Sequence, residues 1–158
     1  TSSDSPIEFI LLMPNQVPIH EGLFTWPSTK PQLLGSRCVD CAETAFPAQP
    51  DCRNCGSRET KIVELGDRGT LWTWTIQTFM PKAPYNSDET PETFQPYGVG
   101  YVEMPGGVRV ESRLLPNKPE DLQIGMPMQL DIIPFRTDGT DGSGDQIMTF
   151  RFSPVKEA

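Results

Sequence analysis

The sequence predicts a mostly β protein, in which a small metal-binding module precedes a compact barrel. The 158-residue chain carries 17 prolines and 13 glycines and few long apolar runs, which favours short strands and turns over long helices. From residue 62 onward, apolar residues recur with the period of two that is typical of strands. Upstream of that region lie two Cys-x-x-Cys pairs separated by ten residues. This length suits one small metal module attached to one barrel.

The first 31 residues are expected to form an arm with a short helix. The apolar segment 7–13 lies between Pro6 and Pro14, and it is too short to fold alone and too apolar to remain in water. We expect it to dock, either on this protein's own barrel or on a partner. The short helix is expected within residues 20–26, before Pro27.

The metal-binding module is expected at residues 32–61. Two Cys-x-x-Cys turns can face each other and direct four thiolates at one point, an arrangement that Zn²⁺ accepts with tetrahedral geometry. We therefore expect one structural zinc per chain. Its expected ligands are Cys38, Cys41, Cys52 and Cys55, which are all the cysteines of the chain.

Two other uses of the cysteines are less favoured. Disulfides suit exported proteins, but the first residues show no export signal. A rubredoxin-type iron centre also takes four thiolates, yet such electron carriers consist of little more than their metal loop. Zinc is the preferred interpretation.

The residues after the two cysteine pairs differ. Gly56 follows the second pair, where a positive φ lets backbone N–H groups turn toward sulfur. Ala42 follows the first pair. We expect a slightly different turn there, with the metal site preserved.

Residues 62–158 are expected to form the barrel, because five strand candidates in about ninety residues fit a small closed or nearly closed barrel. In the candidate 108–115, Val108, Val110, Ser112 and Leu114 share one face. For Trp72, Trp74 and Phe79, a place in the barrel core is preferred over a role as stacking platforms for nucleic-acid bases. The other candidates are residues 69–79, 98–103, 128–135 and 146–152.

Two connections between strands are unusual. Residues 81–96 are long for such a link and carry Tyr85 and Phe94, so we expect a functional loop. Residues 136–145 are rich in glycine and aspartate and are expected to form a mobile hairpin tip. A calcium loop is disfavoured because Gly142 and Ser143 stand where ligands would be needed.

Charge and hydropathy narrow the function classes. The net charge of −8 repels polyanions, so nucleic acid is not an expected partner. No segment approaches the length of a membrane span. We expect a soluble, cytoplasmic protein without a membrane partner.

The sequence offers little for independent catalysis. The single histidine, His20, lies in the arm, and a zinc held by four thiolates keeps no position for water. Carboxylates are plentiful but scattered, with no pair evidently placed in a cleft. We therefore expect a chain that is not an enzyme by itself.

The order of motifs resembles an acyl-CoA-associated family that joins a rubredoxin-like zinc ribbon to an OB-fold. The likeness covers most of residues 18–153 and rests on the cysteine pairs combined with downstream motifs. Small subunits of benzoylsuccinyl-CoA thiolases are similar too. The matching segments are residues 33–41 (LLGSRCVDC), 52–56 (CRNCG), 66–75 (GDRGTLWTWT) and 124–128 (IGMPM).

This resemblance implies a required, non-catalytic subunit of a thiolase-superfamily complex that cleaves or forms C–C bonds in acyl-CoA thioesters. The partner would carry the cysteine and histidine chemistry, and coenzyme A could be shared with it. We expect four aromatic residues near the partner or the acyl-CoA entrance: Phe79, Tyr85, Phe94 and Tyr97. Three basic residues are candidates for contacts with CoA phosphates: Arg68, Lys82 and Arg109.

A single-stranded nucleic-acid-binding module is the alternative function. Zinc ribbons and OB-folds often bind single strands through aromatic platforms and basic grooves. The acidic charge balance weighs against this alternative.

Overall fold

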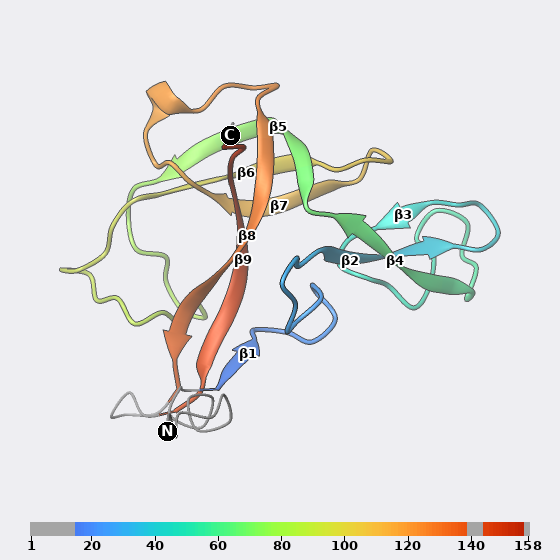
Figure 1. Cartoon of the computed structure of the whole chain (residues 1–158), viewed down its shortest axis with the longest axis horizontal. Coiled ribbons are helices and arrows are strands. Elements are labelled where there is room, and N and C mark those ends of the chain that lie inside the picture. Colours follow the sequence, from blue (N-terminus) through green and yellow to red (C-terminus); the bar gives the residue numbers. More distant parts are fainter. Residues whose placement is uncertain (1–14, 139–143, 157–158) are drawn as a thin grey trace, which may run out of the picture.

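The computed structural model describes residues 15–138 and 144–156, which form two sheets (Figure 1). The apolar arm segment 7–13 and the centre of the glycine-rich tip, residues 139–143, lie outside the described residues. The strands are β1 (Gln16–Pro18), β2 (Leu33–Cys38), β3 (Thr44–Ala45), β4 (Thr60–Gly66), β5 (Arg68–Gln77), β6 (Tyr97–Glu103), β7 (Arg109–Leu114), β8 (Pro127–Thr137) and β9 (Gln146–Pro154).

The smaller sheet has three strands in the order β3-β2-β4, and both of its pairings are antiparallel. Leu33 of β2 and Leu65 of β4 are buried in the same core cluster as the barrel residues, so the smaller sheet shares its core with the larger one. The expected boundary between residues 61 and 62 falls within β4. The division into residues 1–31, 32–61 and 62–158 stays a prediction.

The larger sheet closes into the expected five-stranded barrel. Its strands follow the ring β5-β6-β7-β9-β8, and β8 also pairs with β5. β7 and β9 run parallel, whereas the other neighbours in the ring are antiparallel. β1 adds to β9 as a sixth, parallel strand.

The barrel core forms where apolar residues alternate along the strands. Val110 and Leu114 of β7 are buried together with Ser112, so the predicted inward face of this strand is confirmed. Apolar side chains from the other strands complete the same core. Those fully shielded from water include Leu71, Val102, Met128 and Phe152.

A β-bulge changes the faces of β5. Its pairing with β6 shifts register between Leu71 and Thr73, and such a bulge breaks strict alternation. Leu71 is therefore fully buried and Trp74 packs against the core, while Trp72 is 44% exposed. The predicted core positions of Trp72 and Phe79 are wrong, since Phe79, beyond the end of β5, is 70% exposed.

The short helix expected within residues 20–26 is also not observed. Phe24 forms a β-bridge with Leu33, and Thr25 N–H donates to the Gln32 carbonyl at 2.9 Å. This pairing buries Phe24 in the core, so tertiary packing overrides local helix formation. The described residues contain one short 3-10 helix, Pro119–Asp121, and no helix long and apolar enough to cross a membrane.

Candidate metal centre and an aromatic groove

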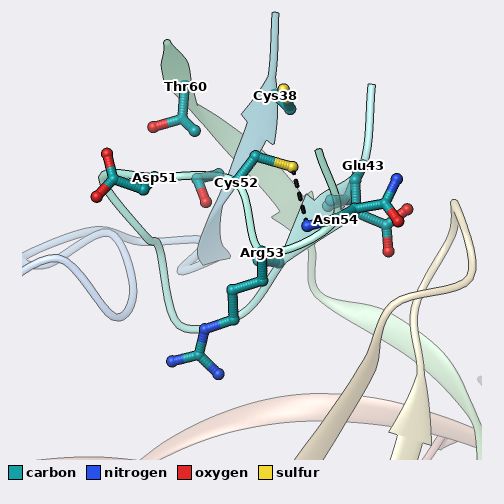
Figure 2. A pocket seen from close by; sticks show the side chains of 10 residues that line it. Cys38, Glu43, Asp51, Cys52, Arg53, Asn54 and Thr60 are labelled. Atoms are coloured by element: carbon teal, nitrogen blue, oxygen red, sulfur yellow. Dashed lines mark hydrogen bonds between the residues drawn. The ribbon is translucent and has the colours of Figure 1, made fainter. Parts of the chain in front are cut away.

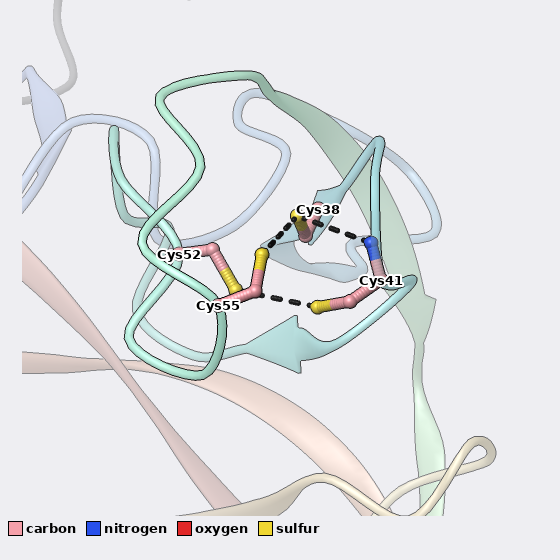
Figure 3. A group of neighbouring side chains, drawn as sticks. All are labelled: Cys38, Cys41, Cys52 and Cys55. Carbon is pink, nitrogen blue, oxygen red and sulfur yellow. Dashed lines mark hydrogen bonds between the residues drawn. The ribbon is translucent and has the colours of Figure 1, made fainter.

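The four cysteine sulfurs converge, as Figure 3 shows. All four lie within 4.8 Å of one another. The closest pairs join the two turns: Cys38 Sγ lies 3.6 Å from Cys55 Sγ, and Cys41 Sγ lies 3.5 Å from Cys52 Sγ. A tetrahedral zinc with Zn–S bonds of about 2.3 Å holds sulfurs about 3.8 Å apart, whereas a disulfide needs about 2.05 Å. The sulfur spacing therefore fits a site in which four thiolates hold one metal ion.

The two Cys-x-x-Cys turns have the same backbone geometry. The Ala42 N–H donates to the Cys38 carbonyl, and the Gly56 N–H donates to the Cys52 carbonyl, both at 3.0 Å. Ala42 and Gly56 have φ angles of 64° and 77°. The different turn expected at Ala42 is therefore not observed, because alanine itself adopts the left-handed conformation.

This strained alanine predicts a stabilising substitution. Ala42→Gly should raise the free energy of unfolding by about 0.5 kcal/mol, since relief of left-handed strain outweighs the added entropy of the unfolded chain. The reciprocal change Gly56→Ala should lower it by about 1 kcal/mol, although open space surrounds that position. Chemical denaturation of both variants with zinc present measures the difference. If both substitutions changed the free energy of unfolding by the same amount in the same direction, the two turns could not share the left-handed backbone conformation.

Hydrogen-bond donors surround the sulfurs. The backbone N–H groups of Cys41 and Asn54 donate to Cys38 Sγ at 3.5 Å and Cys52 Sγ at 3.4 Å. In Figure 2 the Asn54 contact lies beside a hollow of about 340 Å³, and the Arg53 side chain extends away from the Cys52 sulfur. The backbone therefore supplies the partial positive charge that these sulfurs contact.

The close approach of the four thiols and the surrounding hydrogen bonds shift the thiol pKa values in opposite directions. Hydrogen bonds, chiefly from the Cys41 backbone N–H, lower the pKa of Cys38 to about 6. The Glu43 backbone and the Asn54 side chain lower the pKa of Cys41. The Ser57 backbone lowers the pKa of Cys55, but the three neighbouring sulfurs and burial outweigh it and raise the value to about 12. Four thiolates this close need a cation to ionise together.

The four aromatic residues expected at the partner surface occupy two adjoining sites. Phe79 and Phe94 line one hollow with residues of the long loop, while Tyr85 and Tyr97 line a separate groove. The Phe94 and Tyr97 rings meet edge to face with centroids 5.9 Å apart. The structure thus connects all four, but not in a single pocket.

The three basic candidates do not converge. Arg68 begins β5 and Lys82 lies beyond its other end, so the ten-residue strand, about 33 Å long, separates them. Arg109 begins β7, pairs with Glu103 at 3.2 Å and stacks on Trp72 at 3.8 Å. Arg68 and Arg109 lie near the same end of the sheet, because Thr70 and Arg109 both pair with Glu103, whereas Lys82 lies beyond the opposite end of β5. The three positions together therefore do not form one phosphate site.

Arg113 lines the same groove as Tyr85 and Tyr97, and the sequence analysis did not single it out. It points outward from β7 between the buried Ser112 and Leu114, stacks over the Tyr97 ring at 3.8 Å and donates to the Tyr85 hydroxyl at 2.9 Å. An arginine on the polar face of a strand resembles any solvated charge. No sequence signal distinguishes it, because its partners are distant in the chain.

Comparisons with known proteins agree with this architecture. Residues 29–60 match the family model for the rubredoxin-like zinc ribbon domain of ChsH2, and residues 62–132 match the model for its C-terminal OB-fold domain. The chain also resembles a chain of a solved structure described as an Ltp2-ChsH2(DUF35) aldolase. That likeness has a TM-score of 0.56 and 26% identity, and it covers 78% of this chain and 84% of the other.

Curated relatives give the same result. A DUF35 domain-containing scaffold protein of Methanothermobacter thermautotrophicus is 30% identical over 112 residues, which cover 70% of this chain and 78% of that protein. The benzoylsuccinyl-CoA thiolase subunit BbsA of Thauera aromatica is 30% identical over 84 residues, 53% of this chain and 52% of the subunit. The chain belongs to the ChsH2/DUF35 family, in which a rubredoxin-like zinc ribbon precedes an OB-fold domain.

Proposed function

We propose that this chain is a non-catalytic subunit of a thiolase-superfamily complex that cleaves or forms C–C bonds in acyl-CoA thioesters. In this role it stabilises its partner and shapes or gates the acyl-CoA site. The observation that carries the proposal is the likeness, over most of both chains, to a chain of the Ltp2-ChsH2(DUF35) aldolase. The similarity to a thiolase subunit and to a protein named as a scaffold supports it.

We propose that the four clustered cysteines hold one structural zinc. The sulfur spacing and the donors around it fit this ion. When bound, the zinc supplies a rigid cross-link between the two turns, because a site with four thiolates is closed to substrate. Cys38 and Cys52 would act from buried positions, and Cys41 and Cys55 from exposed ones.

The placement of the reactive side chains supports an accessory role. All the cysteines of the chain lie in the metal cluster. His20 is exposed just beyond β1, and its Nδ1 lies 2.7 Å from the backbone carbonyl oxygen of Glu21. We infer that the partner subunit supplies the nucleophile and the general base.

We propose that the hollow around Phe79 and Phe94 contacts the partner near its acyl-CoA entrance. Phe79 is 70% exposed, and Met80, Pro81 and Pro91 surround it. An exposed group of apolar side chains on one loop is typical of a protein interface. Lys82 lies in the same hollow, and of the three basic candidates it remains the one placed to meet a CoA phosphate there.

Co-expression with a thiolase-like partner tests this function. Phe79→Asp should weaken co-purification at least about tenfold, because a buried interface charge without a partner is costly. Ile62→Asp is the matched control, since Ile62 is 65% exposed but lies on β4, and it should leave the complex intact. Full turnover by the partner alone, or equal binding by wild type and Phe79→Asp, would contradict the proposal.

A further inference from the structure

We propose that the groove between the zinc-ribbon loop and the barrel binds an apolar organic monocarboxylate, with Arg113 as its charged contact. The ligand class is a carboxylate carried on a ring system or a short hydrocarbon skeleton. The inference concerns the isolated chain and does not depend on the proposed partner.

The groove has the size and walls of a small-molecule site. Its volume is about 650 Å³, within the range usual for such sites. Phe46 of the ribbon meets Phe150 of the barrel edge to face, with ring centroids 5.7 Å apart, so ribbon and barrel form one continuous apolar lining. Pro47, Val99 and Phe135 extend this lining. Such a lining favours an apolar skeleton, because contact with it removes hydrocarbon surface from water.

Arg113 provides a positioned positive charge within these walls. Its guanidinium lies over Tyr97 at 3.8 Å and within 5.8 Å of the Phe135 ring centroid. One N–H donates to the Tyr85 hydroxyl, and further N–H donors remain. In the part of the chain that the structure describes, Arg113 takes part in none of the ion pairs. A carboxylate can therefore pair with it without displacing a protein anion.

The other charges in the groove select a single negative charge. Arg109 also lines it, but Glu103 already pairs with that arginine at 3.2 Å. Glu111 lies between the two arginines on the same face of β7, about 7 Å along the strand from each. Its carboxylate would repel a second ligand charge. With one unpaired arginine and one nearby carboxylate, the groove suits a monoanion and disfavours polyanions such as nucleotides.

Calorimetric titration of the full, zinc-loaded chain tests the proposal with 2-naphthoate and its uncharged isostere 2-naphthamide. Wild type should bind the carboxylate about tenfold more tightly than the amide, the difference expected for one charge-assisted contact. Arg113→Gln should abolish this preference and change amide affinity by less than about twofold. Arg109→Gln is the matched control and should keep the preference, because its charge is already paired.

Arg113→Lys separates charge from loop position, since Arg113 also holds Tyr85. This variant keeps the charge and should retain part of the preference for the carboxylate. The proposal is overturned if wild type binds neither probe or binds both equally. It also fails if Arg113→Gln keeps the preference, or if Arg113→Lys loses it as completely as the glutamine variant does.

Discussion

Replacing Cys52 by serine is expected to abolish zinc binding and unfold the smaller sheet. Cys52 is buried, and its sulfur lies 3.5 Å from that of Cys41. A hydroxyl at this place cannot supply the fourth thiolate, and structural zinc contributes an apparent binding free energy of about 10–16 kcal/mol in small zinc modules. Because Leu33 and Leu65 of this sheet are part of the barrel core, unfolding of the smaller sheet should also destabilise the barrel. Zinc content and thermal unfolding measure both effects.

The control for this experiment keeps all four sulfurs. Ser57→Ala removes the hydrogen bond that Ser57 Oγ donates to Asp40 Oδ2 at 2.5 Å and the one that it accepts from the Glu59 N–H at 3.1 Å. This variant should retain one zinc, with a loss of about 1 kcal/mol in stability. A Cys52→Ser protein that still holds one zinc and melts like wild type would refute four-thiolate ligation. Iron in place of zinc in the wild-type protein would support the electron-carrier alternative.

The features that could be predicted from sequence are those set by local spacing. Each Cys-x-x-Cys pair closes its own turn, so the convergence of Cys38, Cys41, Cys52 and Cys55 needs only that the two turns meet. The inward face of β7 follows from alternation along one unbroken strand. The cysteine cluster and the inward face of β7 were predicted correctly because each depends on residues that are close together in the sequence.

The features that the sequence analysis missed depend on contacts between distant segments. Arg113 lies among aromatic side chains only because the fold brings Tyr85, Tyr97 and Phe135 to it from three other segments. The expected helix at residues 20–26 is replaced by pairing of Phe24 with Leu33, which periodicity does not reveal.

The substitution Gly100→Ala is expected to destabilise the barrel strongly, because Gly100 lies against the backbone beside the β-bulge in β5. At the bulge the Thr73 carbonyl oxygen approaches Gly100 so closely that an added Cβ would lie 2.1 Å from it and 3.0 Å from Trp74 Cα. Both are backbone atoms of the paired strand, so the barrel wall itself must move.

We expect Gly100→Ala to lower the free energy of unfolding by about 3 kcal/mol, the upper range for overpacking. The matched control is Gly98→Ala in the same strand, where the nearest atom, Leu114 Cβ, is 3.1 Å away and the cost should be about 1 kcal/mol. Urea denaturation followed by tryptophan fluorescence compares the two. Equal losses of unfolding free energy in the two variants would mean that the bulge does not hold Thr73 against Gly100. The exposure of Trp72 would then need another cause, because the bulge is what turns the Trp72 side chain out of the core.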